Sequence, residues 1–312
     1  MSDPAPPDGR EVAARRAFAD QARLCDRLGS PFTSRLMGVL ERVLDRSTRT
    51  GRAVLDWPGE ADARGDAVPL RLAGALHALA RDGTRPALSD AWPPDPLADD
   101  ASLERLVRET LARDDETLHA WLAHAPQTNE TGRSAAVHAA AMHVAGIHPL
   151  PIRLFELGAS AGLNLLCDAY GHALGGRRCG ALDSPVQLSP DWTGEAPGGA
   201  EPVIVGRRGC DLSPVDVTDP VARERLLAYV WPDQPVRLAR LRAALDIAVT
   251  NPPIVDAADA ADWVESRLLP EGNTGETRVL FHTIARQYFP AEVSARVAAR
   301  IDACGAAATA EA

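Results

Sequence analysis

Residues 152–164 read Ile-Arg-Leu-Phe-Glu-Leu-Gly-Ala-Ser-Ala-Gly-Leu-Asn, and this stretch decides the fold that the sequence predicts. Its first part, Ile152–Leu157, is a short, mostly apolar run of strand length that ends at a glycine. The segment Pro149–Pro151 precedes it and marks a change in the spacing of the apolar residues. We therefore expect a buried strand, a tight turn at Gly158 and a helix that begins near Ser160.

The chain before this stretch is predicted to be helical, because its apolar residues recur at the spacing of an α-helix. Residues 86–96 are the exception: they include four prolines, which fix φ and lack the backbone donor, so we expect an extended connector. Residues 1–148 should therefore form an all-α N-terminal domain. The predicted helices cover residues 11–28, 32–44, 70–80, 102–124 and 133–146.

Residues 149–312 are predicted to form an α/β domain, because alternating strands and helices are typical of a parallel sheet covered on both faces. Segment 171–200 is rich in glycine and proline and longer than a usual connection, so we expect a lid or an inserted hairpin. After the first strand, further strands are predicted at 203–205, 254–255 and 277–283, with helices from Pro220, over 235–249 and from Pro290.

The composition limits the kinds of partner. A net charge of −10 opposes non-specific attraction to phosphate backbones, so a small molecule or a protein is expected as substrate rather than a nucleic acid. The sequence holds no lysine, which excludes Schiff-base chemistry on that side chain. No apolar run reaches the roughly 18 residues that span a bilayer, and the N-terminus has no signal-peptide pattern, so a cytoplasmic protein is expected.

The cysteine pattern gives no sign of a metal site. The five cysteines are scattered, and no pair has the short spacing that is typical of a zinc site. We therefore expect reduced thiols and no bound metal.

The loop after the first strand has the features of a ligand-binding turn. Glu156 places an acid at the strand end, and Gly158 follows where a larger side chain would block a ligand. A helix that begins near Ser160 would direct its free N–H groups and positive dipole end to the carboxyl edge of the sheet, where α/β folds bind ligands. The spacing of Gly158 and Gly162 fits neither the dinucleotide pattern nor the phosphate loop. A plain tight turn that starts a helix is the alternative.

The pattern Glu156-x-Gly-x-x-x-Gly-x-Asn resembles the first motif of class I methyltransferases, in a variant without the middle glycine. Gln127-Thr-Asn-Glu130 with Arg133 precedes it, and Val230-Trp-Pro-Asp-Gln234 follows it. In this order the three runs resemble the bacterial family called domain of unknown function 2332, over most of the chain. The resemblance implies a Rossmann-like, S-adenosylmethionine-dependent methyltransferase domain behind a helical region. The implied cofactor contacts are Glu156, Gly158, Ala159, Ser160, Gly162 and Asn164.

Two more acids resemble cofactor ligands of that fold. Asp211 follows the second strand, where methyltransferases hold an acid against the ribose hydroxyls, and a carboxylate can accept both hydrogen bonds. A solvated turn aspartate is the alternative. Asp259 follows the third strand, where an acid meets the adenine amino group, and it matches better than Asp256. Its alternative is an N-cap for the helix that follows.

His282 and Tyr288 lie at and after the end of the fourth strand, the region that faces the transferred methyl group in methyltransferases. His282 is the candidate base, because an imidazole titrates near neutral pH and a base is needed when the nucleophile carries a proton. A hydrogen-bonded histidine in the core is the alternative.

Asn251-Pro-Pro253 resembles the turn of methyltransferases that act on amino groups. That motif needs Asn251 at the end of a strand. The apolar residues of 236–248 keep helical spacing, however, which favours a helix terminator instead.

The run Gln127–Glu130 with Arg133 has two interpretations. It is a polar arm of Gln127, Asn129, Glu130 and Arg133 that closes over the cofactor, or it caps the helix that follows. In the second case Thr128 or Asn129 is the cap and Glu130 pairs with Arg133. The later run, Trp231–Gln234, is expected to fix a bend between two helices.

Class I methyltransferases usually have seven strands, and four are predicted here. We therefore expect at least one further strand beyond Ala312, or a sheet edge that pairs with another copy and forms an oligomer. The sequence thus predicts an S-adenosylmethionine-dependent methyltransferase-like enzyme of unknown acceptor. A catalytically silent scaffold of the same fold is the alternative.

Overall fold

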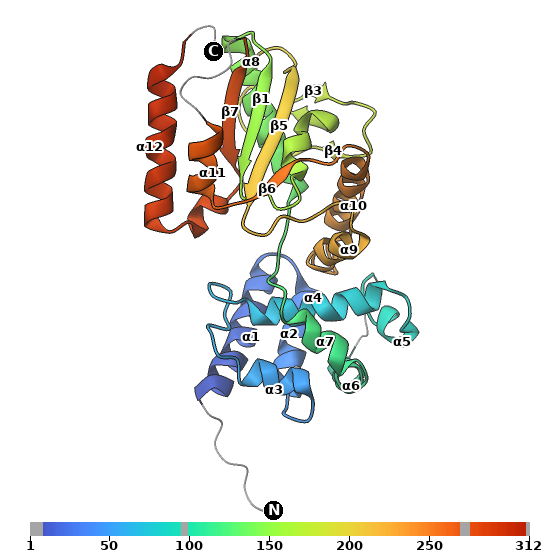
Figure 1. Cartoon of the computed structure of the whole chain (residues 1–312). Coiled ribbons are helices and arrows are strands. Elements are labelled where there is room, and N and C mark those ends of the chain that lie inside the picture. The colour runs from blue at the N-terminus through green and yellow to red at the C-terminus, as the bar shows by residue number, and fades with distance from the viewer. Residues whose placement is uncertain (1–8, 95–98, 269–274, 310–312) are drawn as a thin grey trace, which may run out of the picture. The chain divides into compact units, whose positions relative to one another are not determined.

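The computed structural model describes residues 9–94, 99–268 and 275–309, and the chain forms two compact units (Figure 1). The first unit combines the chain up to Thr128 with Glu224–Leu238, and the second combines Asn129–Arg223 with Ala239–Ala312. The boundary therefore lies at Asn129 rather than at Pro149, and the first unit is discontinuous in sequence. Among the described residues, none of the helices combines the length and the apolar character needed to cross a membrane.

The first unit is helical, as expected. Its core is a single cluster of buried residues that includes Phe18, Leu36, Leu72, Leu103 and Leu118 from different helices. Burial of these apolar faces provides the main stabilisation of such a helix bundle. The helices are α1 (Gly9–Arg27), α2 (Pro31–Val43), α3 (Arg49–Leu55), α4 (Val68–Arg81), α5 (Pro86–Ser89), α6 (Asp100–Arg113) and α7 (Asp115–Trp121).

Two local expectations for this unit are wrong. Pro86–Ser89 forms the short helix α5 instead of an extended connector, because Pro86 occupies the first helical position, where no backbone donor is needed. The predicted helix 102–124 is divided at Asp114, whose carboxylate binds Arg85 at 2.7 Å. The next residue, Asp115, accepts the backbone N–H groups at the start of α3. Tertiary partners of the two aspartates therefore fix the break.

The later segment of the first unit joins α9 (Pro220–Ala228) to α10 (Pro235–Thr250), so the expected bend at Trp231–Gln234 is confirmed. Asp233 in this bend accepts the backbone N–H of Phe32 at 2.9 Å and also binds the Ser30 hydroxyl. It thus acts as the N-cap acceptor of α2 from a distant point in the sequence.

The second unit contains a four-stranded sheet in the order β6-β5-β1-β7, with every pair of neighbours parallel. The predicted first strand is confirmed with its bounds. The second begins one residue later than predicted and is longer, because two of its arginines pair with acids: Arg207 with Asp168, and Arg208 with Asp256. The strands are β1 (Ile152–Leu157), β5 (Ile204–Asp211), β6 (Val255–Ala257) and β7 (Thr277–His282).

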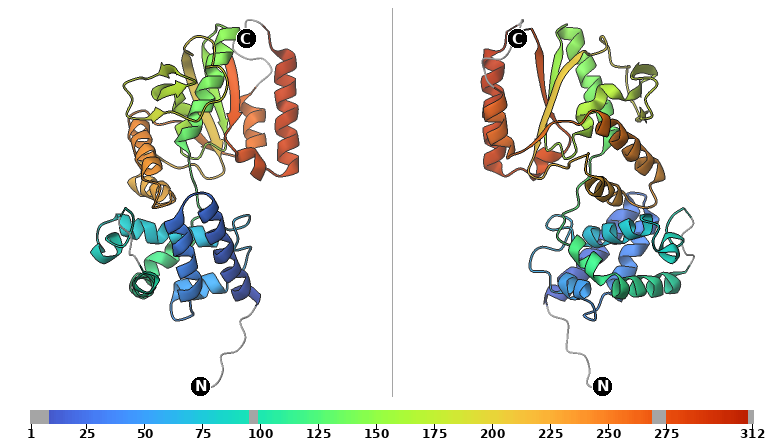
Figure 2. Two further views of the ribbon diagram at one scale, coloured as in Figure 1. Left: turned by 180° about the vertical axis from the view of Figure 1, so that it is seen from behind. Right: turned by 45° about the vertical axis from the view of Figure 1, so that its right-hand side comes forward.

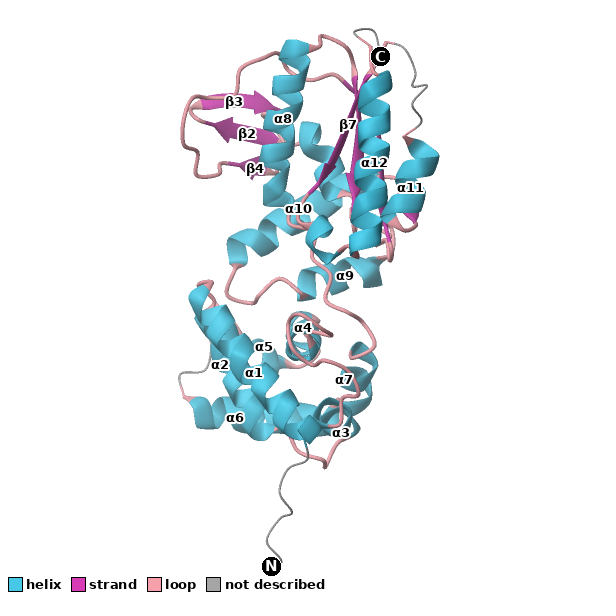
Figure 3. Cartoon of the chain, turned by 90° about the vertical axis from the view of Figure 1, so that its left-hand side faces the viewer, coloured by secondary structure: helices cyan, strands magenta, loops and turns pink. Residues whose placement is uncertain are grey.

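Helices cover both faces of this sheet, as Figures 2 and 3 show. Side chains alternate along β1, so Ile152 and Leu154 face α8 (Ser134–Ile147) and the 3₁₀ helix η2 (Leu163–Ala169). Phe155 and Leu157 pack on the opposite side, with residues of α11 (Ala260–Arg267) and α12 (Ala291–Ala307). The α/β architecture with a parallel sheet is therefore confirmed.

The segment 171–200 contains the expected hairpin. Antiparallel strands β2 (Gly171–Leu174) and β3 (Arg177–Gly180) form it, and the short β4 (Gln187–Leu188) pairs in parallel with β2. The three strands make a small second sheet in the order β3-β2-β4.

Asp256 is expected to make the stability of the folded protein depend on pH in the acid range. Its carboxylate binds the Arg208 guanidinium through two hydrogen bonds of 2.7 and 2.8 Å and accepts the Trp263 indole N–H. The pKa of Asp256 is lowered to about 2, and the hydrogen bond from Arg208 is the largest cause. Because the folded pKa lies below the usual value, this stabilisation is present above about pH 4 and is lost as the pH falls through 2.

We expect Asp256→Asn to lower the free energy of unfolding by roughly 2 kcal/mol at pH 7 and to weaken the dependence on pH below 4. Urea denaturation at pH 7 and pH 3 measures both effects. If the free energy of unfolding of the variant fell between pH 7 and pH 3 by as much as that of the wild type, the pairing would be contradicted.

Candidate functional site

The candidate site lies at the carboxyl ends of β1, β5 and β7. After β1 the chain builds β5 and β6 on one side of that strand and then places β7 on its other side. Open parallel sheets bind ligands where the strand order reverses in this way. In the register of the sheet, Leu157 lies opposite both Cys210 and His282. The segments that follow these three residues, which the sequence predicted to form the site, therefore all begin at the carboxyl edge of the sheet.

Glu156 is fully buried on β1, on the face that α8 and η2 cover. Its Oε1 accepts a long hydrogen bond of 3.4 Å from the Asn164 amide, and its Oε2 has no hydrogen-bond partner among the described residues. Burial raises the pKa of this carboxyl to about 8, although the Asn164 bond opposes the shift. The group is therefore mostly protonated at pH 7 and half protonated only near pH 8.

Asn164 connects three parts of the site. Its side-chain oxygen accepts the Ser134 hydroxyl at 2.8 Å, and its amide nitrogen lies 3.4 Å from both Glu156 Oε1 and Thr283 Oγ1. Asn164 itself is fully buried. It therefore holds α8, β1 and the segment after β7 together, and the sequence interpretation of it as a cofactor contact gains no support.

The predicted polar arm is divided between structural roles. Asn129 is buried and accepts the Leu163 N–H at 2.9 Å, so it caps η2 and not the helix that follows it. Glu130 caps the 3₁₀ turn η1 (Thr131–Arg133) and lies 3.5 Å from Arg240, and its expected pair with Arg133 stays a prediction.

Arg133 donates to the Thr283 carbonyl at 2.8 Å, and its charge acts against the raised pKa of Glu156. It thus places a positive charge near Glu156. Gln127 belongs to the first unit.

The loop after β1 differs from the expected helix start. Ser160 has a left-handed φ of +53°, and regular structure begins only at Leu163, as a 3₁₀ helix with a non-helical Leu166. The helix dipole expected at Ser160 is therefore wrong.

The N–H groups of this loop also bind within the protein. Ala159 donates to the Cys210 carbonyl at 2.9 Å, Ser160 to Asp211 Oδ2 at 2.9 Å, and Gly162 to the Ala159 carbonyl at 2.7 Å. The Ser160 hydroxyl, in contrast, is buried and without a hydrogen-bond partner among the described residues.

The two loop glycines are required by the backbone. Gly158 has φ of +68°, and a Cβ atom there would overlap the Cβ of Ala285, at the start of the 3₁₀ turn η3 (Ala285–Tyr288). Gly162 has φ of +71°, and a Cβ atom there would lie 2.6 Å from the Cβ of Pro253. In this conformation Ala285 therefore occupies the space beside Gly158 that the sequence interpretation reserved for a ligand.

Asp211 ends β5 and holds the loop. Its Oδ2 accepts the Ser160 N–H and its Oδ1 accepts the Ser213 N–H, each at 2.9 Å. A carboxylate has about four lone-pair sites, so both oxygens retain room for a further donor. Asp259 caps α11 by accepting the N–H groups of Ala261 and Asp262, which agrees with the capping alternative.

His282 and Tyr288 are exposed, and Tyr288 is 76% exposed. The alternative of a buried core histidine is therefore wrong. Partial desolvation, with help from the Arg286 charge, lowers the pKa of His282, so its imidazole is neutral and able to accept a proton at pH 7.

Asn251 follows the end of α10 and precedes β6. It is thus not at the carboxyl end of a strand, which the amino-methyltransferase alternative required. The interpretation of Asn251-Pro-Pro as a helix terminator is confirmed.

A cavity of about 400 Å³ lies elsewhere on the unit. Thr277 and Arg278 at the amino end of β7 and Cys304 of α12 contribute to its wall. It is therefore at the end of β7 opposite to the Gly158 loop.

Sequence reasoning missed Ser134 and Ala285. Ser134 is the first residue of a helix and Ala285 is one alanine among many, so no local signal distinguishes them. Only the packing around Asn164 and Gly158 reveals their roles.

Comparison with known proteins gives one result. Residues 15–312 match the family described as "uncharacterized protein conserved in bacteria (DUF2332)". No curated protein and no solved structure matches the chain. Because the match covers nearly all of the sequence, the chain belongs to the DUF2332 family.

Proposed function

We propose that the second unit binds S-adenosylmethionine at the carboxyl ends of β1, β5 and β7, and that the protein is a methyltransferase-like enzyme of unknown acceptor. The observation that carries the proposal is Glu156: a fully buried acid with an oxygen that lacks a partner among the described residues, at the point where the strand order reverses. Buried polar groups in proteins are nearly always hydrogen-bonded, so a ligand donor is the natural partner.

The sheet supports a nucleotide cofactor. In chain order its strands are arranged 3-2-1-4, as are the first four strands of Rossmann-type sheets. In this proposal Asp211 accepts the ribose hydroxyls with its remaining lone pairs, and Glu156 with Ser160 receives the polar groups of the methionine part. Each of these side chains lies at or next to the same sheet edge.

Methyl transfer from a sulfonium mainly requires alignment of the two reactants. His282 is exposed at the end of β7, and its neutral imidazole would accept the proton of an acceptor that carries one. The segment Thr283–Ala285 must shift when the cofactor binds, because Ala285 packs beside Gly158 in this conformation. Ile284 in that segment has a strained φ of +93°, so a shift of the segment would relieve about 1–3 kcal/mol of backbone strain.

Calorimetric titration of the full chain with S-adenosylmethionine and S-adenosylhomocysteine tests the proposal. We expect micromolar binding, and Asp211→Asn should weaken it by at least about tenfold, since each lost charge-assisted hydrogen bond costs about 1.5–3 kcal/mol. Asp216→Asn is the matched control, because that aspartate lies in an exposed turn and its carboxylate accepts from the neighbouring Thr218. An absence of heat with both ligands would refute the proposal.

A second candidate is a catalytically silent scaffold that keeps the same sheet. It is favoured by the internal pairing of the loop N–H groups and by the packing of Ala285 on Gly158. A melting temperature that neither ligand changes, together with a stable oligomer on size exclusion, would support this function over the first.

A further inference from the structure

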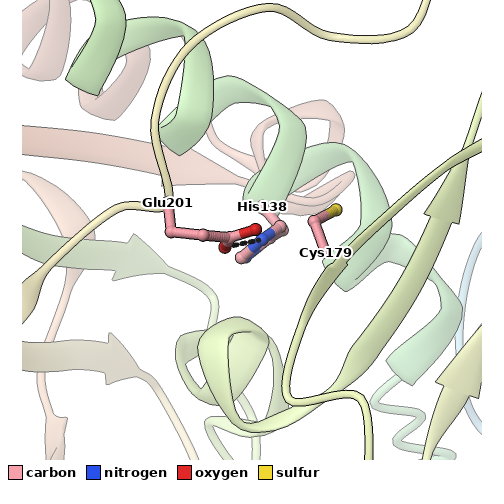
Figure 4. Close-up of side chains that lie close together, drawn as sticks. All are labelled: His138, Cys179 and Glu201. Carbon is pink, nitrogen blue, oxygen red and sulfur yellow. Dashed lines mark ion pairs between the residues drawn. The ribbon is translucent and has the colours of Figure 1, made fainter.

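Three side chains with metal-binding atoms converge in the second unit, away from the candidate cofactor loop. They are His138 of α8, Cys179 of β3 and Glu201 in the loop before β5 (Figure 4). Their ligand atoms all lie within 4.8 Å of one another. Because the three residues are far apart in the sequence, they form no short spacing motif from which the cluster could be predicted.

The geometry fits a small metal ion. His138 Nε2 lies 3.4 Å from Glu201 Oε2. Zinc–ligand bonds of about 2.0–2.1 Å in tetrahedral geometry place a nitrogen and an oxygen ligand roughly 3.3 Å apart. A sulfur ligand completes a set of imidazole, thiolate and carboxylate, which is the set that zinc prefers.

The buried His138 ring has two nitrogens without a hydrogen-bond partner among the described residues. Its side chain is 1% exposed, and Glu201 Oε2, 3.4 Å from Nε2, is an ion-pair partner only for a protonated ring. Leaving such a buried group unsatisfied destabilises the folded protein, and a cation bound to Nε2 would remove that cost. This observation points to a ligand independently of the arrangement of the three side chains.

Neighbouring groups hold two of the ligands in place. The His138 ring stacks on the His172 ring, with centroids 4.2 Å apart, and His172 Nε2 binds the Cys167 carbonyl at 2.7 Å. The Gly180 N–H donates to the Glu201 carboxylate at 3.3–3.4 Å. Such outer contacts orient metal ligands in proteins.

We propose that His138, Cys179 and Glu201 bind one zinc-type divalent ion, with a fourth position left for water or an external ligand. Binding displaces the Cys179 thiol proton to solvent and forms the metal–sulfur bond. The ion links α8, the β2–β3 hairpin and the loop before β5. Glu201 is 54% exposed, so the ion reaches the site from solvent on that side.

Cobalt titration of the chelator-treated full chain tests this proposal. Co²⁺ substitutes for zinc and gives a thiolate-to-cobalt charge-transfer band in the near ultraviolet. We expect one equivalent to bind with this band, and zinc to displace it. Cys179→Ser should abolish the band, while Cys25→Ser, which alters a buried thiol of the first unit, should retain it.

Glu201→Gln gives a second test that does not depend on a buried residue. Loss of outer partners weakens metal sites by about 10–100-fold, so loss of a direct ligand should raise the Co²⁺ dissociation constant by at least about tenfold. Glu195→Gln, an exposed change in the same loop, should leave it unchanged. A wild-type protein without the charge-transfer band, or a band that survives in Cys179→Ser, would overturn the proposal.

Discussion

Glutamine in place of Glu156 should reverse the order of stability of the variant and the wild type between pH 5 and pH 9. The carboxyl is fully buried, and its pKa is raised to about 8. An acid whose folded pKa exceeds its unfolded pKa contributes full stability below the unfolded value, near 4.5, and loses that contribution as the pH rises through 8. The wild type should therefore lose on the order of 5 kcal/mol across this window.

The variant has no such loss, because an amide does not ionise. Its extra N–H group needs an acceptor, and an unmet donor costs about 1–3 kcal/mol, so the variant should be the less stable protein at pH 5. At pH 9 it should be the more stable one. Urea denaturation across this range measures the crossing, with the exposed Glu116→Gln as control. Parallel curves for Glu156→Gln and the wild type would show that this carboxyl does not titrate as described.

Alanine at position 158 should destabilise the protein by about 2–5 kcal/mol, whatever the protein binds. The left-handed φ of Gly158 costs a residue with a Cβ atom roughly 1–2 kcal/mol, and overpacking against Ala285 adds about 1–3 kcal/mol. Denaturation in urea measures the change.

The double variant Gly158→Ala with Ala285→Gly separates the two causes. Removing the Ala285 methyl group relieves the overlap but not the backbone strain, so a double-mutant cycle should show a coupling of about 1–3 kcal/mol. A Gly158→Ala variant within 0.5 kcal/mol of the wild type, the ordinary range for uncoupled surface changes, would contradict this packing. Because the substitution disturbs the free protein, loss of cofactor binding in a Gly158 variant would not identify a ligand contact. Asp211→Asn is the cleaner probe.

Sequence patterns predicted the fold where burial is periodic. Ile152–Leu157 is apolar apart from Arg153 and Glu156, and its bounds are those of β1. The pattern failed where polar side chains find tertiary partners. β5 extends through Arg207 and Arg208 because acids elsewhere in the chain neutralise them, and hydropathy alone does not reveal such pairs.

The sequence predicted where the candidate site lies in the sheet, but not which hydrogen bonds its residues make. A glycine turn after a strand identifies a sheet edge, and Glu156 and Asp211 do lie there. Which N–H groups remain free depends on residues distant in sequence, such as Asn129, which occupies the Leu163 N–H. The convergence of His138, Cys179 and Glu201 is likewise a product of topology, since three separate elements supply one ligand atom each.

The capping of α2 by Asp233 has a consequence for biosynthesis. Domains of many proteins fold as soon as the ribosome has released them, beginning at the N-terminus. Here the first helices emerge long before the carboxylate that satisfies the Phe32 N–H, because most of the second unit is translated in between. The N-terminal helices therefore receive this cap only after Asn129–Arg223 has been translated, and the second unit cannot be completed before the first, because its strands β6 and β7 are made later still.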